Sequence, residues 1–407
     1  MGRPPTFSAA MQNIVIAKPY VFVPPHRGDF WPKLFAKTLP GYLRKNFGIA
    51  NIATRGLERL DQSIAAGHSI MLTPNHCRPC DPFVLACAIS RPAFVMASWH
   101  LFMQSRLQRF LLPRIGVFSV YREGMDRDAL KCAIQLLTEA KRPLIVFPEG
   151  VISRHNDKLN NLMDGPALML RSAAKQRAEA GGKVVVHPVA IRYFFNGDLE
   201  AAVKPVLAGI EKRLAWQTQD SLPLIERILK CGVALLSLKE IEFFGSAQVG
   251  TLAERIARLV DRMFSPLEDE WLKGRRETNV VARGKLLRSA ILPDLIADDI
   301  SEAERQRRWR QLEIMYFAQQ IAFYPPGYLT SSKNTPERLL EVVEKLEEDL
   351  TDTCRIHSPM RAVVEVGEAI EVSKERQRSP DGDPLMNTIR ERLETRLAAL
   401  LAEGRPN

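Results

Sequence analysis

Between residues 69 and 193 the sequence alternates short apolar runs with longer amphipathic stretches, and this alternation most limits the folds open to the chain. Apolar runs of about four to eight residues are typical of buried strands, whereas apolar residues about three to four apart indicate helices. Strands alternating with helices favour an α/β layered domain with a mostly parallel sheet and helices on its faces. The expected strands are residues 69–73, 94–97, 117–121, 144–147 and 184–191.

The stretch between the third and fourth of these strands has the spacing of a helix. Leu130, Ile134 and Leu137 recur along one face. Either Asp126 or Asp128 can cap its beginning.

Residues 31–48 mix aromatic and aliphatic side chains with lysine and arginine. We expect Pro40-Gly41 to divide this stretch into two short helices, because proline breaks a helix interior. Basic charge beside aromatic residues suits a helix lying in a membrane interface. An ordinary amphipathic helix packed on its own domain fits the pattern equally well.

The C-terminal half changes from helical to strand-like. Residues 200–356 are mostly helical and rich in Leu, Glu and Arg, with no internal repeat evident, and strand patterns then return at 362–367 and 369–372. Because a lone strand pair is marginally stable, we expect these strands to rejoin the first sheet, which makes 200–356 a large helical insertion. The predicted regions are 1–50 (N-terminal arm and amphipathic helices), 51–199 (α/β core), 200–356 (helical insertion) and 357–407 (final strand and C-terminal helix rejoining the core).

The net charge of +10 favours an anionic partner, such as nucleic acid, an anionic membrane surface or a phosphorylated small molecule. The basic residues are spread out and lack an aromatic stacking platform, which argues against nucleic acid. No uninterrupted apolar run reaches the ~18 residues of a transmembrane helix. We therefore expect any membrane contact to be peripheral, on the inner face of a membrane.

The six cysteines are scattered and lack a disulfide-like spacing, which fits a reducing cytoplasm. Cys77-x-x-Cys80 adjoins His76, as in half of a metal site. No second Cys/His pair follows at zinc spacing, so we expect no metal.

His76 and Asp81 follow the first predicted strand, at the carboxyl edge where sites form in parallel sheets. On a short loop the carboxylate can bind Nδ1 of the imidazole, which leaves Nε2 to act as a general base. Taken singly, His76 could be a structural histidine and Asp81 a helix N-cap before Pro82. The sequence has no Gly-x-Ser-x-Gly elbow, so base-assisted direct transfer fits better than a covalent serine mechanism.

Three further features adjoin predicted strands: 116–122, 147–150 and 187–189. Arg122 ends its strand and is a candidate for bidentate phosphate binding, or for a surface salt bridge. Glu149 could accept hydrogen bonds from a substrate polyol, orient Arg122, or serve as a turn residue.

Taken in order, the four features resemble the four motif blocks of the phospholipid/glycerol acyltransferase family. His76 and Asp81 match its catalytic His-x4-Asp pair. By this resemblance Pro188, between Val186 and Val189, lies on the acyl-donor side. The late stretch 364–370 is similar to the family's final core strand. The positions implied to bind the acceptor are Gly116, Phe118, Arg122, Phe147, Pro148, Glu149 and Gly150.

The sequence departs from the family pattern at two positions. After Gly150 the family usually carries Thr-Arg-Ser, whereas this chain has Val151-Ile152-Ser153 with Arg154 next. Either Arg154 compensates for the missing cation at Ile152, or the acceptor is not a simple phosphomonoester. Tyr121 also stands where many members carry Asp.

The resemblance implies an acyltransferase that moves a fatty acyl group from acyl-CoA or acyl-carrier protein to the hydroxyl of a glycerolipid precursor. Lysophosphatidic acid or another lysophospholipid would be the acceptor, and His76, oriented by Asp81, the general base. No cofactor beyond the acyl thioester is implied. Residues 101–114 could press on the bilayer or simply cover the sheet. The alternative is a catalytically weak lipid-binding protein on the same fold, which Ile152 and the large insertion favour; the oligomeric state stays open.

Overall fold

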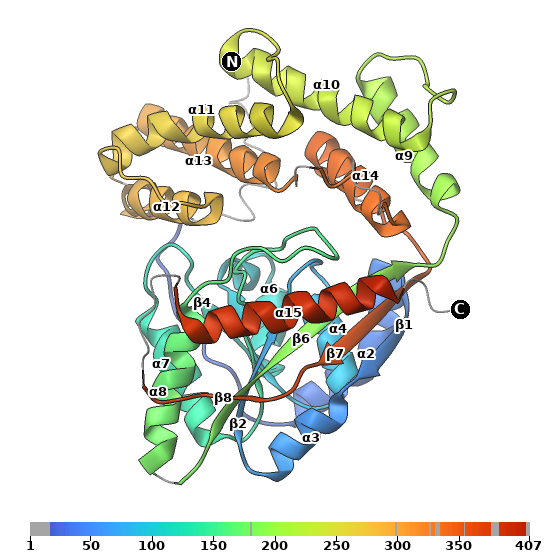
Figure 1. Ribbon diagram of the computed structural model, residues 1–407. Helices are drawn as coiled ribbons and strands as arrows, with labels where there is room; N and C mark the ends of the chain where they lie inside the picture. Colours follow the sequence, from blue (N-terminus) through green and yellow to red (C-terminus); the bar gives the residue numbers. More distant parts are fainter. Residues whose placement is uncertain are drawn as a thin grey trace. The chain divides into compact units, whose positions relative to one another are not determined.

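The computed structural model describes residues 17–179, 181–297, 299–324, 327–329, 334–353, 355–375 and 382–403. The chain divides into two compact units, an α/β unit and a helical unit (Figure 1). Residues 1–16 of the expected N-terminal arm lie outside the described residues. The α/β unit contains Phe22–Tyr121, Asp126–Gly197 and Ile356–Asn407, and the helical unit contains Met1–Val21, Arg122–Met125 and Asp198–Arg355.

Within the described residues the α/β unit has one sheet of eight strands in the order β1-β7-β6-β2-β5-β3-β4, with β8 also pairing with β6. The five strands from β6 to β4 run parallel, whereas β7 pairs antiparallel with β6. The predicted mostly parallel sheet is therefore confirmed. The strands are β1 (Ile49–Arg55), β2 (Ser69–Pro74), β3 (Phe94–Ser98), β4 (Val117–Val120), β5 (Leu144–Ile145), β6 (Val184–Phe195), β7 (Met360–Val366) and β8 (Ile370–Glu371).

Strand β1 was not among the strands expected from the sequence. This strand lies at the sheet edge and pairs in parallel with β7, which is about 300 residues away along the chain. Asn51, Thr54 and Arg55 interrupt its apolar residues, so the sequence has no continuous apolar run that would predict this strand. Pairing with a distant segment, rather than local pattern, forms this strand.

Residues 30–47 form one helix, α2 (Phe30–Phe47), with Pro40 inside it, so the expected division into two helices is wrong. An interior proline costs a helix about 3 kcal/mol. Packing outweighs this cost, because Leu39 and Leu43 are each 1% exposed. Tyr42 adds an edge-to-face contact with Phe83 of α4 (Asp81–Ile89).

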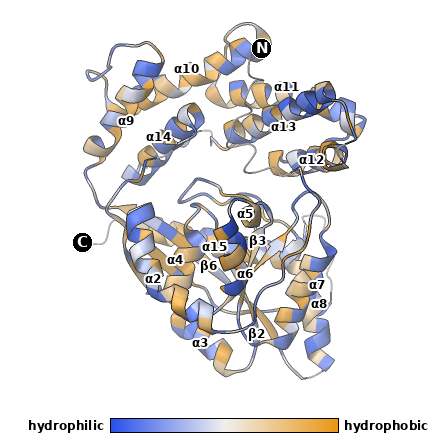
Figure 2. Ribbon diagram, turned by 180° about the vertical axis from the view of Figure 1, so that it is seen from behind, coloured by the Kyte–Doolittle hydropathy of each residue, from blue (hydrophilic) through white to orange (hydrophobic). Residues whose placement is uncertain are grey.

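Helices cover both faces of the sheet, and in each unit the helices carry a hydrophobic and a hydrophilic side (Figure 2). One core cluster joins the strands to helices α7 (Arg127–Glu139), α8 (Gly165–Glu179) and α15 (Pro384–Ala402). Phe194 of β6 packs with Leu397 of α15, whereas its neighbour Tyr193 contacts Cys80 before α4. Since successive side chains point to opposite faces, α15 and α4 lie on opposite sides of the sheet. The remaining helices of the unit are α3 (Leu57–Ala65), α5 (His100–Met103) and α6 (Arg106–Arg114).

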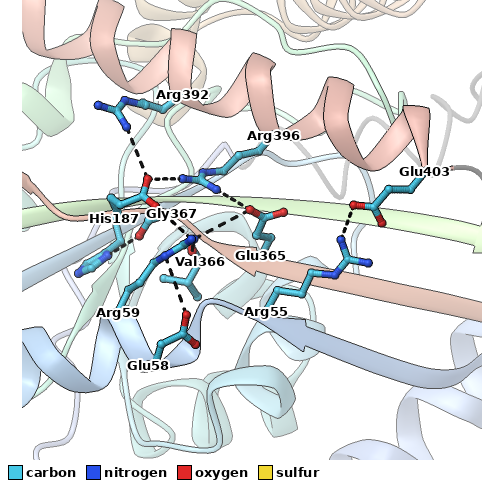
Figure 3. Close-up of polar contacts among 11 residues, drawn as sticks. Arg55, Glu58, Arg59, His187, Glu365, Val366, Gly367, Arg392, Arg396 and Glu403 are labelled. Atoms are coloured by element: carbon cyan, nitrogen blue, oxygen red, sulfur yellow. Dashed lines mark hydrogen bonds and ion pairs between the residues drawn. The ribbon is translucent and has the colours of Figure 1, made fainter. Parts of the chain in front are cut away.

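Ion pairs attach the end of β7 to two helices. Figure 3 shows Arg59 of α3 and Arg396 of α15 converging on the carboxylate of Glu365. Arg59 also donates to the Val366 carbonyl at 2.7 Å, and Arg396 binds Glu368 at 2.7 Å. These contacts fix the C-terminal segment in the sheet.

The helical unit is built from α9 to α14, and arginine–glutamate pairs join its first four helices. Glu211 of α9 binds Arg227 of α10, Glu240 of α10 binds Arg255 of α11, and Glu268 of α11 binds Arg283 of α12, each through two hydrogen bonds. The bounds are α9 (Leu199–Arg213), α10 (Leu224–Phe244), α11 (Leu252–Leu272), α12 (Val280–Ala297), α13 (Glu302–Ala322) and α14 (Pro336–Thr351).

These pairs recur at intervals of about 28 residues along the chain. The recurrence involves single charged positions within dissimilar helices, so the sequence shows no internal repeat around them. In the described part of both units, no helix is long and apolar enough to cross a membrane.

Candidate active site

The first element of the site is the turn that follows β2. β2 ends at Pro74, and the amide side chain of Asn75 then takes the place of the next backbone pair. It donates to the Ile191 carbonyl at 3.0 Å and accepts from the Ile191 N–H at 2.7 Å. The β2–β6 ladder thus continues through a side chain, which frees the backbone to turn at His76.

His76 and Asp81 meet across this turn. Nδ1 of His76 lies 2.8 Å from Oδ2 of Asp81, and the Asp81 side chain is fully buried while that of His76 is 16% exposed. Asp81 is the first residue of α4 rather than its N-cap, which is Cys80. Its carboxylate therefore has no capping bond to make. It accepts instead from the Arg78 N–H at 2.9 Å and from the Tyr193 hydroxyl at 2.5 Å.

These N–H and O–H donors fix the orientation of the Asp81 carboxylate, and hence that of the imidazole. Burial raises the pKa of Tyr193 well above its usual value, so its hydroxyl remains a donor. With Nδ1 directed at Asp81, Nε2 of His76 makes no hydrogen bond to any residue that the structure describes. The ring lies against Phe147, with 4.3 Å between the ring centroids.

Glu149 supports the same turn from the loop after β5. Its carboxylate accepts from the His76 N–H at 2.7 Å and from the Asn160 N–H at 2.9 Å, and the residue is 1% exposed. Burial raises the pKa of this carboxyl group to about 7, although the two backbone donors lower it. The Ser153 N–H also donates to the His76 carbonyl at 2.7 Å.

The rest of the loop after β5 is held by several local contacts. Gly150 adopts φ +68°, a left-handed conformation that glycine takes without strain, and its N–H bonds to the Phe147 carbonyl at 3.2 Å. The Pro148 carbonyl accepts from Met163 at 2.8 Å. Arg154, next to Ser153, also has positive φ (+60°), which is strained for a residue other than glycine. A strained conformation next to a candidate site is itself a reason to suspect a function.

Asn156 fastens this loop to β6, and it was not among the site residues expected from the sequence. Its amide donates to the Tyr193 carbonyl at 2.5 Å and accepts from the Tyr193 N–H at 2.7 Å. Beside it, Arg192 and Asp157 form an ion pair at 3.9 Å between side chains that are each 1% exposed. Asn75 and Asn156 bind residues that lie two apart on β6, Ile191 and Tyr193. This relation becomes visible only once the chain is folded, so no signal in the sequence points to Asn156.

The other predicted positions lie away from this turn or in the other unit. Gly116 precedes β4, at the amino end of the strand, and Phe118 is fully buried in the core. β4 is separated from β2 by β5 and β3, which at ~4.8 Å between strands places it about 14 Å away. Arg122 belongs to the helical unit, so its role stays a prediction.

Pro188 lies inside β6, buried between β2 and the C-terminal strands. Its carbonyl accepts from the Gly367 N–H at 2.8 Å, where β7 has ended and β8 has not begun. A residue without an N–H is tolerated at such a gap in the ladder. Its neighbour His187 is fully buried between the Ser63 hydroxyl and the Gly367 carbonyl, and burial lowers the pKa of its imidazole.

Cys77 and Cys80 are both buried beside Asp81 and Tyr193. Burial raises the pKa of the Cys80 thiol to about 12, so this sulfur stays protonated. The described residues contain no cluster of three or more His, Cys, Asp or Glu side chains suited to a metal ion.

Comparison with known proteins adds two findings. Residues 51–192 match the family model described as acyltransferase. A 1-acyl-sn-glycerol-3-phosphate acyltransferase from Streptococcus pneumoniae is 30% identical over 93 residues, which cover 23% of this chain and 33% of that protein. The chain thus spans about a third of the length of this curated relative. The segment matched by the family model includes His76, Asp81, Glu149 and Pro188 and ends before α9, the first helix of the helical unit.

Proposed function

We propose that the chain transfers a fatty acyl group to the hydroxyl of a glycerolipid precursor, because residues 51–192 match the acyltransferase family model. The donor is an acyl thioester, acyl-CoA or acyl-carrier protein. The acceptor is a lysophospholipid such as lysophosphatidic acid. The bacterial relative supports this choice, because its name specifies 1-acyl-sn-glycerol-3-phosphate, which is lysophosphatidic acid, as the acceptor.

The observation that carries the proposal is the contact between His76 and Asp81. A carboxylate that accepts from Nδ1 fixes the tautomer in which Nε2 holds a lone pair. Nε2 then takes the proton of the acceptor hydroxyl while its oxygen attacks the thioester carbonyl. The carbon–sulfur bond breaks, and the leaving thiolate takes the proton back from Nε2. The acceptor leaves as an ester and the donor as a free thiol.

The residues around the pair position it rather than react. Glu149 holds the backbone of His76 through a hydrogen bond, and Phe147 supports the ring. Arg154, which has a strained backbone conformation, directly follows Ser153, whose N–H binds the His76 carbonyl. We assign it to the acceptor phosphate, in place of the cation that Ile152 does not supply.

Peripheral membrane association is part of the proposal. Phe30 is 70% and Leu107 65% exposed, and Trp31 joins them by packing its ring on Phe110 of α6. The Arg114 guanidinium lies over the Phe110 ring. Aromatic and aliphatic side chains beside cations suit the interface of an anionic bilayer. Cosedimentation with anionic vesicles tests this surface. If Phe110→Ser leaves vesicle binding unchanged, the surface does not bind the membrane.

The test of the reaction is transfer from radiolabelled acyl-CoA to lysophosphatidic acid, lysophosphatidylcholine and monoacylglycerol. We expect His76→Ala to lower the rate by about 10²-fold or more. The control is His26→Ala, the same substitution at an exposed position of the same unit. Arg154→Ala should raise KM for lysophosphatidic acid more than for monoacylglycerol. Unchanged turnover in His76→Ala would end the mechanism, and vesicle binding without thioester consumption would favour a lipid-binding role.

A further inference from the structure

The helical unit contains an apolar cavity that no part of the proposed reaction uses. It has a volume of about 420 Å³, within the range of ~300–1,000 Å³ that is usual for small-molecule sites. Helices α10, α11, α13 and α14 and the segment 327–329 form its walls. Its aliphatic lining includes Leu229, Val233, Leu236, Ile256, Ile321 and Leu346.

Helix α10 leaves apolar surface uncovered along this cavity. Residues 232–236 are all apolar and all only half-buried, and Leu238 is 53% exposed. Figure 2 shows the hydrophobic stretches of this helix. A Cβ atom added at Gly232 would meet only the Leu346 side chain, at 3.8 Å. The glycine therefore opens space in the cavity wall rather than allowing close backbone packing.

The charged groups at the cavity are already paired with each other. Among the described residues, three charged side chains line it: Lys239, Glu242 and Asp349. Lys239 binds Glu242 at 2.8 Å. Asp349 accepts from the Tyr324 hydroxyl at 2.7 Å and pairs with Lys345 at 3.3 Å. The charges of the described lining are thus balanced within the protein, so this lining suits an uncharged occupant.

We propose that this cavity binds a single long aliphatic chain, the acyl chain of a fatty acid or lipid. The inference rests on the proposed function, because acyl transfer brings aliphatic chains to this polypeptide as donor and product. The volume and the paired charges fit the chain itself rather than an anionic head group. The helical unit is then a lipid-binding module attached to the α/β unit.

The test uses the full-length protein and a palmitic acid analogue with a mid-chain diazirine, photolysed and mapped by peptide mass spectrometry. We expect label on α10 and on the α13–α14 segment, displaced equally by palmitate and by the neutral palmityl alcohol. Gly232→Leu should cut the labelling about tenfold or more, because the new side chain fills the cavity. Its effect on helix stability should be favourable, since leucine is the better helix former.

The control is Gly209→Leu in α9, where an added Cβ meets only the Arg355 side-chain end at 3.7 Å, outside the cavity. This variant should label as the wild type does. The measurement is repeated in His76→Ala, where labelling should persist; failure of the reaction and failure of the cavity proposal are thereby separated. Label confined to residues 51–192, labelling unaffected by Gly232→Leu, or a self-association that Gly232→Leu abolishes would each overturn the proposal.

Discussion

Glu149 shows how burial and hydrogen bonding compete at a single residue. The buried carboxyl group accepts from the N–H groups of His76 and Asn160, yet burial raises its pKa from 4.5 to about 7. Between these values the folded protein binds a proton that the unfolded chain has released. The stability contributed by this group is therefore full below pH 4.5, falls as the pH rises to about 7, and then stays level.

We expect the free energy of unfolding of the wild type to fall by on the order of 3 kcal/mol across this window on account of Glu149. Glu149→Gln removes the titration, and its amide also directs N–H groups at a backbone donor, so the variant should be less stable at pH 8. The measurement is urea unfolding of both proteins from pH 4 to pH 8. Other groups titrate alike in both, so curves that run parallel would show that Glu149 has an ordinary pKa.

At the scale of elements, two asparagines attach the site loops to β6. Asn75 binds both backbone groups of Ile191, and Asn156 binds both backbone groups of Tyr193. Beyond Val189, where pairing with β2 stops, these side chains replace the missing neighbouring strand. The loops that carry His76 and Ser153 are thus held at alternate positions of one strand, Ile191 and Tyr193.

Asn156→Ala leaves two buried backbone groups without partners, at a cost of about 1–3 kcal/mol each. We expect a loss of roughly 2–4 kcal/mol in the free energy of unfolding and slower acyl transfer, because the Ser153–His76 contact belongs to the same loop. Asn46→Ala is the matched control, since among the described residues this exposed side chain bonds only to the Tyr42 carbonyl. Equal stabilities of the two variants would contradict the role of Asn156.

The sequence was informative where the signal is local. Apolar runs located β2, β3, β4 and β6, and the family resemblance pointed to His76 and Asp81, which the fold brings within 2.8 Å. Signals that depend on tertiary pairing were missed, namely β1, Asn156 and the repeated arginine–glutamate pairs. A polar strand, a lone amide and single charges have no local pattern, because their partners lie in distant segments.

At the scale of the whole molecule, the helical unit interrupts a continuous sheet. β6 ends at Phe195 and β7 begins at Met360, and these two residues are paired neighbours. The Asn196 N–H donates to the Pro359 carbonyl at 3.0 Å. The chain therefore leaves and re-enters the α/β unit at the same place, across a gap that a few residues can span.

We predict that replacing residues 199–355 with a short Gly-Ser linker leaves an α/β unit that folds, whereas truncation after residue 355 does not. Truncation removes β7, β8 and α15, and β1 loses its partner. Burial of the α15 side chains contributes about 2 kcal/mol each. Their sum approaches ~10 kcal/mol, the entire stability of a typical domain. The buried side chains lost are Met386, Ile389, Leu393, Leu397 and Leu400.

Circular dichroism and cooperative thermal unfolding of the two shortened chains decide the point. The excised chain should melt in one transition with the spectrum of a mixed α/β fold, because every strand of the sheet remains. The truncated chain should show no cooperative transition, although it keeps His76, Asp81 and Glu149 and is the longer of the two. A folded truncation beside an unfolded excision would mean that the helical unit, and not the C-terminal segment, completes the core around β6.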